Sequence, residues 1–392
     1  MHFTEIVFWT CLFIIFYNYA GYTLILAIAV TIKKIFIRKP PVVNVIEPDV
    51  TLIIAAYNEA DFIEKKISNC FELIYPENKL HFIFITDGSS DNTPQKVSQH
   101  NRIQLLHQPE RKGKTAALNR AMQYVNTPIV VFCDANTLLN PLAIKNIVRH
   151  YPNPAVGGVS GEKKIITSFN TQTAGIGEGI YWKYESLLKK LDSAFYSVVG
   201  AAGELFSIRT ALFDPVDPAV ILDDFIISLK VAMKGYRIIY EPEAYAMEAP
   251  SVSMEDEQKR KIRISAGGFQ SMVMLKGLLN IFKFPLLSFQ YISHRVLRWT
   301  LTPLSLPLLL LSNCILSADS EKMIFKVLLI CQLTFYCLAL LGSYFTRKGI
   351  KIKSLYIPYY FLFMNFSVYW GFLRFLNNAQ PAAWEKASRE KP

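Results

Sequence analysis

The sequence is poor in charge and lacks the common signatures of phosphate loops and zinc sites. Only 19% of the 392 residues are charged, against about 25% in soluble domains, whereas 52% are hydrophobic. No GxxxxGKS/T segment occurs and no GxGxxG follows the first predicted strand, which excludes a P-loop and disfavours a dinucleotide fingerprint. The six cysteines form no CxxC and no His pair has zinc spacing, so we interpret the thiols as packing groups in a reducing compartment. This composition predicts a soluble domain joined to membrane-spanning helices.

A long charge-free run near the N-terminus predicts a membrane anchor in residues 1–40. The 27 residues between Glu5 and Lys33 carry no charge, and about 20 apolar residues cross a bilayer as a helix. The alternative, a cleaved signal peptide, requires a basic start and a short apolar core. Here the basic residues Lys33, Lys34, Arg38 and Lys39 follow the run. The positive-inside rule therefore predicts an uncleaved anchor and a cytosolic domain after it.

Three further charge-free windows of 20 residues each lie near the C-terminus. They are bounded by Arg298 and Asp319, by Lys326 and Arg347, and by Lys353 and Arg374. They predict three transmembrane helices in residues 300–376, with the first hairpin outside and the second inside. By this count the tail, residues 377–392, would be outside, although its basic residues disfavour that side.

Residues 276–299 mix lysine and arginine with phenylalanine, tyrosine and tryptophan, and are too polar to span a bilayer. This mixture predicts interfacial helices on the inner leaflet. The Arg298–Trp299 pair is interpreted as an interfacial anchor. Because this segment holds much of the basic excess behind the net charge of +11, nucleic acid is not expected as a partner.

Residues 41–275 alternate strand and helix patterns, which predicts an α/β domain. Apolar, β-branched runs over 50–56, 81–86 and 128–133 are typical of buried parallel strands, and helical patterns separate them. In such sheets the ligand binds beyond the carboxyl ends of the strands.

Polar side chains follow all three of these predicted strands. A single polar strand end is commonly a helix cap, as we expect for Asp91 and Asn92. Three polar strand ends at one edge are less easily explained as caps, and they permit a nucleotide pocket with acids for ribose and metal. A basic turn, residues 111–115, opens the next helix and favours a phosphate, with a solvated turn as the alternative. The strand-end residues are Tyr57, Asn58 and Glu59, then Asp87, then Asp134 and Asn136.

Six motifs in order resemble the family 2 glycosyltransferases of the GT-A fold, in the membrane branch of cellulose, hyaluronan, chitin-oligomer and poly-N-acetylglucosamine synthases. The resemblance runs from about Val50 to Gly268 and extends to the membrane layout. The motifs are YNEA at 57–60, TDGS at 86–89, KGK with ALN over 112–119, DAN at 134–136, AAGE at 201–204 followed by Arg209, and LDD at 222–224.

The resemblance implies a UDP-sugar site, a divalent metal and one catalytic base. An acceptor hydroxyl must lose a proton to a carboxylate, whereas UDP already leaves well and needs its charge neutralised. A helix cap is the alternative role for the Asp223–Asp224 pair. The implied donor-binding residues are Tyr57, Asn58, Glu59, Asp87 on the uridine, Lys112, Lys114, Asp134 and Arg260. The implied metal ligands for Mn²⁺ or Mg²⁺ are Asp134 and Asn136, and the implied catalytic residues are Asp224 as base, Asp223 and Arg263.

Two departures from the family pattern bear on function. Asn136 replaces the second carboxylate of the DxD metal motif, which weakens the site unless the diphosphate supplies most ligands. In the QxxRW motif, Arg263 matches the arginine, Arg260 replaces the glutamine and Ile264 replaces the tryptophan. Without that flat ring, and with only three C-terminal spans, we expect short products. Enclosing a long chain would require a homo-oligomer or an export partner.

We therefore expect a multi-pass enzyme of the cell membrane with a cytosolic catalytic domain. It would be an inverting transferase that moves a sugar, UDP-GlcNAc or UDP-Glc being the expected donor, onto a β-linked surface polysaccharide or oligosaccharide. One alternative is a lipid glycosyltransferase of the ceramide-glucosyltransferase or polyprenyl-phosphate type, with a lipid-linked acceptor. The other is an inactive channel or assembly subunit.

Overall fold

The computed structural model describes residues 2–36, 46–165, 173–249, 253–319, 321–350 and 352–377. Two parts of the membrane prediction fall outside these ranges. They are the basic pair Arg38 and Lys39, and residues 378–392 of the predicted tail.

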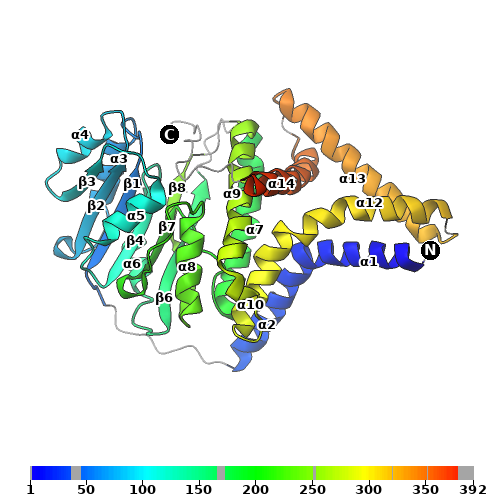
Figure 1. Cartoon of the computed structure of the whole chain (residues 1–392), viewed down its shortest axis with the longest axis horizontal. Coiled ribbons are helices and arrows are strands. Elements are labelled where there is room, and N and C mark those ends of the chain that lie inside the picture. Colours follow the sequence, from blue (N-terminus) through cyan, green and yellow to red (C-terminus); the bar gives the residue numbers. More distant parts are fainter. Residues whose placement is uncertain are drawn as a thin grey trace.

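One sheet of eight strands, in the order β3-β2-β1-β4-β7-β6-β8-β5, forms the centre of the soluble domain (Figure 1). Strands β1, β2 and β4 correspond to the three predicted strands and run parallel, as does β3, which was not predicted. Strand β7 runs antiparallel to both β4 and β6. The chain order reverses between β1 and β4, so a ligand crevice is expected at their carboxyl ends. The strands are β1 (Val50–Ala56), β2 (Leu80–Asp87), β3 (Ile103–Gln108), β4 (Ile129–Asp134), β5 (Leu138–Leu139), β6 (Val156–Ile165), β7 (Leu205–Arg209) and β8 (Arg237–Glu248).

Apolar side chains on both faces of the sheet are buried under helices, which explains the unbroken apolar runs of the parallel strands. Along β1, Leu52 and Ile54 join one core cluster and Ile53 joins the other. The α/β prediction is confirmed. The covering helices are α3 (Ile63–Phe71), α4 (Thr93–Ser98), α5 (Lys114–Met122), α6 (Ala143–Val148), α7 (Thr173–Phe195) and α8 (Asp223–Met233), with short turns η2 (Glu77–Lys79) and η3 (Thr210–Leu212). Helix α9 (Met254–Met274) and the turn η4 (Lys276–Leu279) follow in the chain.

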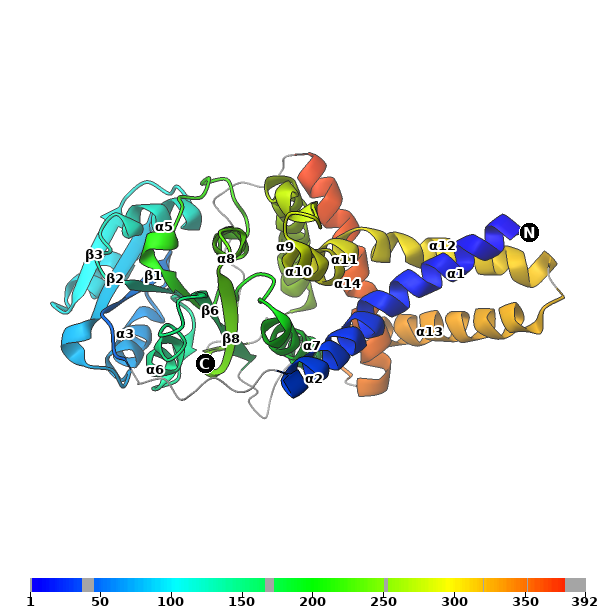
Figure 2. The ribbon, with the colours of Figure 1, turned by 90° about the horizontal axis from the view of Figure 1, so that it is seen from below.

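Apolar helices project away from the sheet domain in both views (Figures 1 and 2). Within the described residues, three helices are long and apolar enough to cross a membrane. The first, residues 2–36, consists of α1 (His2–Phe16), η1 (Tyr17–Gly21) and α2 (Tyr22–Phe36); the others are α12 (Leu301–Asp319) and α13 (Met323–Arg347). Lys322 pairs with Glu5 at 2.8 Å, so the start of α1 and the α12–α13 turn lie at the same end.

The predicted third C-terminal span is the 24-residue helix α14 (Lys353–Leu376). It is not one of the three helices above, and it packs closely on α9. A Cβ on Gly371 would come within 2.4 Å of the Ser265 Cβ, so glycine is needed at this crossing. The helix thereby forms a wall next to the sheet domain.

The predicted interfacial segment has one exposed apolar side and one buried side. It contains η4 (Lys276–Leu279), α10 (Pro285–Tyr291), η5 (Ile292–Val296) and α11 (Leu297–Trp299). Phe282, between η4 and α10, is 93% exposed, as expected at an interface. The anchor interpretation of Arg298 and Trp299 is wrong, because both side chains are buried inside the protein. Arg298 neutralises the buried Glu185, and Trp299 packs on Gly268.

Buried polar contacts attach the N-terminal helix to the soluble domain. The amide of Asn18 donates to the Ser293 carbonyl at 3.0 Å, and the Tyr22 hydroxyl donates to Asp192 at 2.5 Å. His294 lies 2.6 Å from the other oxygen of Asp192. The N-terminal helix and the sheet domain therefore share one buried polar network, which fixes their relative position.

Candidate active site

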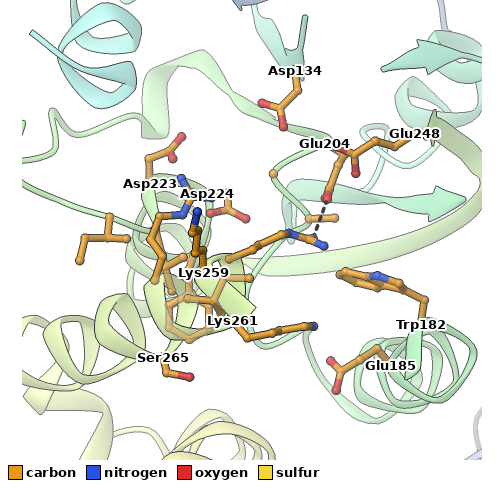
Figure 3. Close-up of a pocket in the computed structure, with 18 of the residues that line it drawn as sticks. Asp134, Trp182, Glu185, Glu204, Asp223, Asp224, Glu248, Lys259, Lys261 and Ser265 are labelled. Atoms are coloured by element: carbon orange, nitrogen blue, oxygen red, sulfur yellow. Dashed lines mark ion pairs between the residues drawn. The ribbon is translucent and has the colours of Figure 1, made fainter. Parts of the chain in front are cut away.

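A cavity of about 800 Å³ lies between the carboxyl edge of the sheet and the helices α7, α9 and α14. Figure 3 shows Asp134, Glu204 and Glu248 on the sheet side of the cavity and Lys259, Lys261 and Trp182 on helices opposite. Ten of the residues predicted from the sequence line it: Tyr57, Glu59, Asp87, Lys114, Asp134, Asn136, Asp223, Asp224, Arg260 and Arg263.

At one end of the cavity, the carboxylate of Asp87 holds the basic turn in place. One oxygen accepts the backbone amides of Lys112 at 2.9 Å and Gly113 at 2.7 Å. The other oxygen is buried and accepts no hydrogen bond from the described residues. A Cβ on Gly88, which has φ +68°, would lie 2.7 Å from the Arg111 Cα, so this approach requires glycine. The site can therefore offer a buried acceptor to a ligand.

Tyr57 lies beside the same turn, with the Arg111 guanidinium 3.7 Å from its ring centroid. The two remaining predicted residues, Asn58 and Lys112, do not line the cavity. Asn58 has a left-handed φ of 51° and accepts the Ser90 amide at 2.8 Å, so it shapes the loop. Lys112 contributes its backbone amide, while its exposed side chain lies 3.5 Å from Glu110. Their predicted contact with the nucleotide stays a prediction.

Of the two residues expected to cap α4, one does so and the other does not. Asp91 accepts the Thr93 amide at 3.0 Å, as predicted for a cap. Asn92 stands at the cap position without a side-chain hydrogen bond. The second oxygen of Asp91 accepts the Ala60 amide at 3.0 Å, so this residue also ties the first strand end to the second.

Lys114 links the carboxylates of two elements. Its ammonium lies 2.6 Å from Asp134 at the end of β4 and 3.8 Å from Asp223 at the start of α8. Burial alone would lower the pKa of Lys114, but the two carboxylates outweigh burial and hold it above its ordinary value. Lys114 is therefore charged, and its ammonium pairs with Asp134, the carboxylate predicted to bind metal. The other predicted ligand, Asn136, places its amide nitrogen 3.4 Å from Glu248.

Asp224 lies in the first turn of α8 and faces the cavity. The cap position of α8 is Leu222, and no side chain caps the helix, so the capping alternative for Asp223 and Asp224 is not realised. Burial and the neighbouring Asp223 carboxylate raise the pKa of Asp224 to about 7. A Cβ on Gly203 would lie 3.1 Å from the Asp224 carboxylate, so glycine leaves that carboxylate room. Asp224 can therefore accept a proton near neutral pH.

Helix α9 lines the opposite wall with basic side chains. Arg260 lies 3.4 Å from Glu257 and 3.8 Å from Glu204. Burial and the charge of Arg260 lower the pKa of Arg263 to about 10, so it remains a cation at neutral pH. Ile264 lines the cavity where the family resemblance implies a tryptophan.

Other residues line the cavity that the motifs did not assign. Trp182, Glu185 and Lys189 come from α7, and Arg295 and Arg298 come from the segment interpreted as interfacial. The sequence around these lysines and arginines does not predict a position in the cavity, because only the packing of α7 against η5 and α11 brings them together. Conversely, Arg209 of the predicted acceptor-side segment does not line the cavity: it donates to the Val156 carbonyl at 2.8 Å.

The fold resembles that of a solved glycosyltransferase. The mannosyltransferase PcManGT from Pyrobaculum calidifontis, in complex with GDP-Man and Mn²⁺, superposes with a TM-score of 0.71 at 24% identity. The match covers 96% of this chain and 100% of that one. The sheet and its flanking helices thus form a GT-A domain with added apolar helices.

Sequence comparison adds an independent similarity. Residues 51–214 match the model of glycosyl transferase family 2, so this segment of the chain forms a family 2 domain. The poly-beta-1,6-N-acetyl-D-glucosamine synthase of Staphylococcus aureus (strain MSSA476) is 29% identical over 264 residues, 64% of this chain. The synthase of the same name from Staphylococcus epidermidis is 24% identical over 234 residues, 57% of this chain. The matched segments span 62% and 55% of the lengths of these relatives.

Proposed function

We propose that the chain is a membrane-embedded inverting glycosyltransferase that moves GlcNAc from UDP-GlcNAc onto a β-linked surface polysaccharide or oligosaccharide. The observation that carries the proposal is Asp224, a cavity carboxylate whose pKa of about 7 suits a general base. The relatives named as N-acetylglucosamine synthases favour this sugar over glucose. The catalytic domain would lie on the cytosolic side of the cell membrane, an orientation that the basic residues after the first span favour.

In this mechanism Asp224 takes the proton of the acceptor hydroxyl as its oxygen attacks the anomeric carbon. The bond from that carbon to the UDP oxygen breaks on the opposite face, so a single displacement inverts the configuration. Lys114 and Arg263 lie near the cavity carboxylates and would offset the negative charge that develops on the leaving diphosphate. The free oxygen of Asp87 would accept the N–H of the uracil ring.

The cavity residues can hold a divalent cation only when the diphosphate of a bound sugar donor supplies further ligands. Within the described ranges, no group of three or more His, Cys, Asp and Glu side chains is placed to hold a metal. Asp134 and Asn136 would supply two oxygen ligands, which Mg²⁺ and Mn²⁺ accept, and the diphosphate would supply others. When bound, the ion would act as a Lewis acid on the diphosphate. Lys114 would have to release Asp134 as the ion enters.

The experiment that tests this proposal is a donor panel. The purified full-length chain would be incubated with UDP-GlcNAc, UDP-Glc and GDP-Man, and nucleotide release and product mass would be measured. We expect release from UDP-GlcNAc and a product one or more N-acetylhexosamine units heavier. Release from GDP-Man alone would refute the assigned donor. No release from any donor would favour the inactive-subunit alternative.

A further inference from the structure

Lys189 of α7 is a buried cation that faces the cavity. Its side chain is 3% exposed, and it lines the cavity opposite the sheet. Within the described parts of the chain, its ammonium makes neither a hydrogen bond nor an ion pair with a carboxylate. Its close contact is the ring of Trp182, whose centroid lies 5.5 Å away.

The other buried lysines of the described residues are all satisfied. Lys66 donates to the Thr137 carbonyl at 2.8 Å, Lys163 pairs with Glu204 at 2.7 Å, and Lys261 lies 3.4 Å from Glu257. A buried ammonium without a carboxylate is costly, and a cation–π contact offsets only part of that cost. Burial lowers the pKa of Lys189, in keeping with its lack of a paired anion. Lys189 is therefore poised to receive an anion from a ligand.

Two arginines, Arg295 and Arg298, line the same cavity as Lys189. Arg295 lies 3.2 Å from Glu185, and Arg298 also pairs with that carboxylate. We call Lys189, Arg295 and Arg298 the basic floor. Glu185 pairs with both arginines, whereas Lys189 pairs with no carboxylate of the described residues and has only longer-range electrostatic interactions with Glu162, Glu204 and Glu185. Lys189 is thus the cation of this group that can pair with a phosphate or diphosphate.

The basic floor is separate from the expected position of the donor's diphosphate. Lys114 interacts with Asp134, Asp223 and Asp224 at the sheet edge. Lys189 instead interacts with Glu162, Glu204, Glu185 and Arg295. Lys114 begins α5 on the sheet side of the cavity, whereas Lys189 lies on α7, so the two cations come from different walls.

Beyond the basic floor, the lining of the cavity becomes apolar. Phe361, Met364 and Val368 of α14 line it, and so does Tyr19 of η1, next to the helices that are apolar enough to cross a membrane. An apolar passage beside a basic floor suits a molecule with a hydrocarbon chain and a phosphate.

We propose that the basic floor binds a phosphate or diphosphate group carried by the acceptor, which is a saccharide linked through that group to a membrane lipid. This inference rests on the proposed function and names the acceptor class for it. The saccharide would extend from the floor toward Asp224, and the lipid would lie along α14. The donor would keep its own diphosphate site at Lys114 and Asp134.

The test compares three acceptors with the full-length protein in detergent micelles. The first is a polyisoprenyl diphosphate-linked GlcNAc, the second an alkyl β-glycoside of GlcNAc without phosphate, and the third the water-soluble GlcNAc 1-phosphate. Lys189→Met preserves the length and apolar stem of the side chain. Lys190→Met alters the exposed neighbour on the same helix and is the matched control. Lys189→Arg should restore the charge.

We expect Lys189→Met to raise the KM for the diphosphate-linked acceptor roughly tenfold or more, the scale of one lost charge-assisted contact. The KM for the alkyl glycoside, and the slow release of UDP without acceptor, should stay unchanged, as should all values for Lys190→Met. Equal use of the alkyl glycoside and the diphosphate-linked acceptor by the wild type would overturn the proposal, even if Lys189→Met fails to fold. Equal use of GlcNAc 1-phosphate would support the phosphate site and refute the lipid. Absence of UDP release under every condition would refute the proposed function itself.

Discussion

The ammonium of Lys114 lies 2.6 Å from the Oδ1 of Asp134, the carboxylate expected to bind metal. The lysine thus occupies the metal position and neutralises a carboxylate that would otherwise face Asp223 across the cavity. Cation binding is then an exchange of one positive charge for another at Asp134. Because Asn136 adds no charge, the affinity for the ion should be modest without the diphosphate.

Metal dependence follows from this exchange. We expect activity with Mn²⁺ or Mg²⁺ and none after EDTA. Asn136→Asp should lower the metal concentration that gives half-maximal activity, because a second carboxylate would compete better with Lys114. Asn101→Asp adds the same charge at an exposed position away from the cavity and should change nothing. An EDTA-resistant wild-type enzyme would remove Asp134 and Asn136 from this role.

Asp224→Asn should abolish transfer while UDP binding persists. The amide cannot take the hydroxyl proton, and loss of a general base costs about 10² to 10⁴ in rate. Transfer would be measured as UDP release with acceptor, and nucleotide affinity by calorimetry. Turnover close to the wild-type value would assign the base to another carboxylate, of which Asp223 is the nearest candidate.

The pH profile should report the raised pKa of Asp224. The base acts without its proton, so the rate should rise with pH through about 7 and fall below it, where the carboxyl is protonated. Asp223→Asn removes a repulsive charge and should move the midpoint to lower pH. Lys114→Met removes an attractive charge and should move it to higher pH. A wild-type rate that is flat between about pH 6 and pH 8 would exclude Asp224 as the titrating base.

Membrane orientation can be tested by cysteine labelling in a background without native cysteines. Lys112 and Glu321 are both exposed, at the sheet domain and at the α12–α13 turn. A cysteine at 112 should resist an impermeant reagent applied to intact cells, whereas one at 321 should react. Glu257, on α9, is buried and therefore unsuitable as a reporter. The reverse pattern would overturn both the topology and the cytosolic donor site.

The half of the site at the strand ends could be predicted, because its residues follow directly after strands that the sequence reveals. Apolar runs define where β1, β2 and β4 end, and parallel strands bring Tyr57, Asp87 and Asp134 to one edge. The mixed order around β7 was not predictable, because antiparallel pairing of β7 with β4 depends on contacts far apart in the chain.

On the helix side of the cavity, the interpretation of two residues as a membrane anchor is wrong for a physical reason. Arg298 and Trp299 combine charge and aromatic area, a composition that suits a membrane interface and a buried ion network equally well. Only Glu185, more than 100 residues earlier and buried on α7, decides between them. The sequence likewise does not distinguish Lys189 from an ordinary exposed lysine of a helix, because its burial depends on the packing of the folded chain.

The last prediction concerns product length and starts from Ile264. This residue lines the cavity but offers no flat ring on which a sugar can stack. Trp182 and Tyr181 are the aromatic side chains that could replace it from α7. Cations already lie over both rings: Lys163 is 5.0 Å and Lys189 5.5 Å from the Trp182 centroid, and Lys261 is 4.2 Å from that of Tyr181. These contacts compete with sugar stacking, so the acceptor should be held loosely and products should be short.

Ile264→Trp should therefore shift products to greater length while leaving UDP-sugar hydrolysis nearly unchanged. Ile264→Leu is the matched control, because it keeps an apolar side chain of the same volume and adds no ring. Product mass, measured by mass spectrometry at equal donor consumption, distinguishes the variants. A lengthening seen with tryptophan and not with leucine would assign the effect to stacking rather than to volume. High-mass polymer from the wild-type chain alone would contradict the argument, because it would mean that the acceptor is held through many transfers without a ring at position 264.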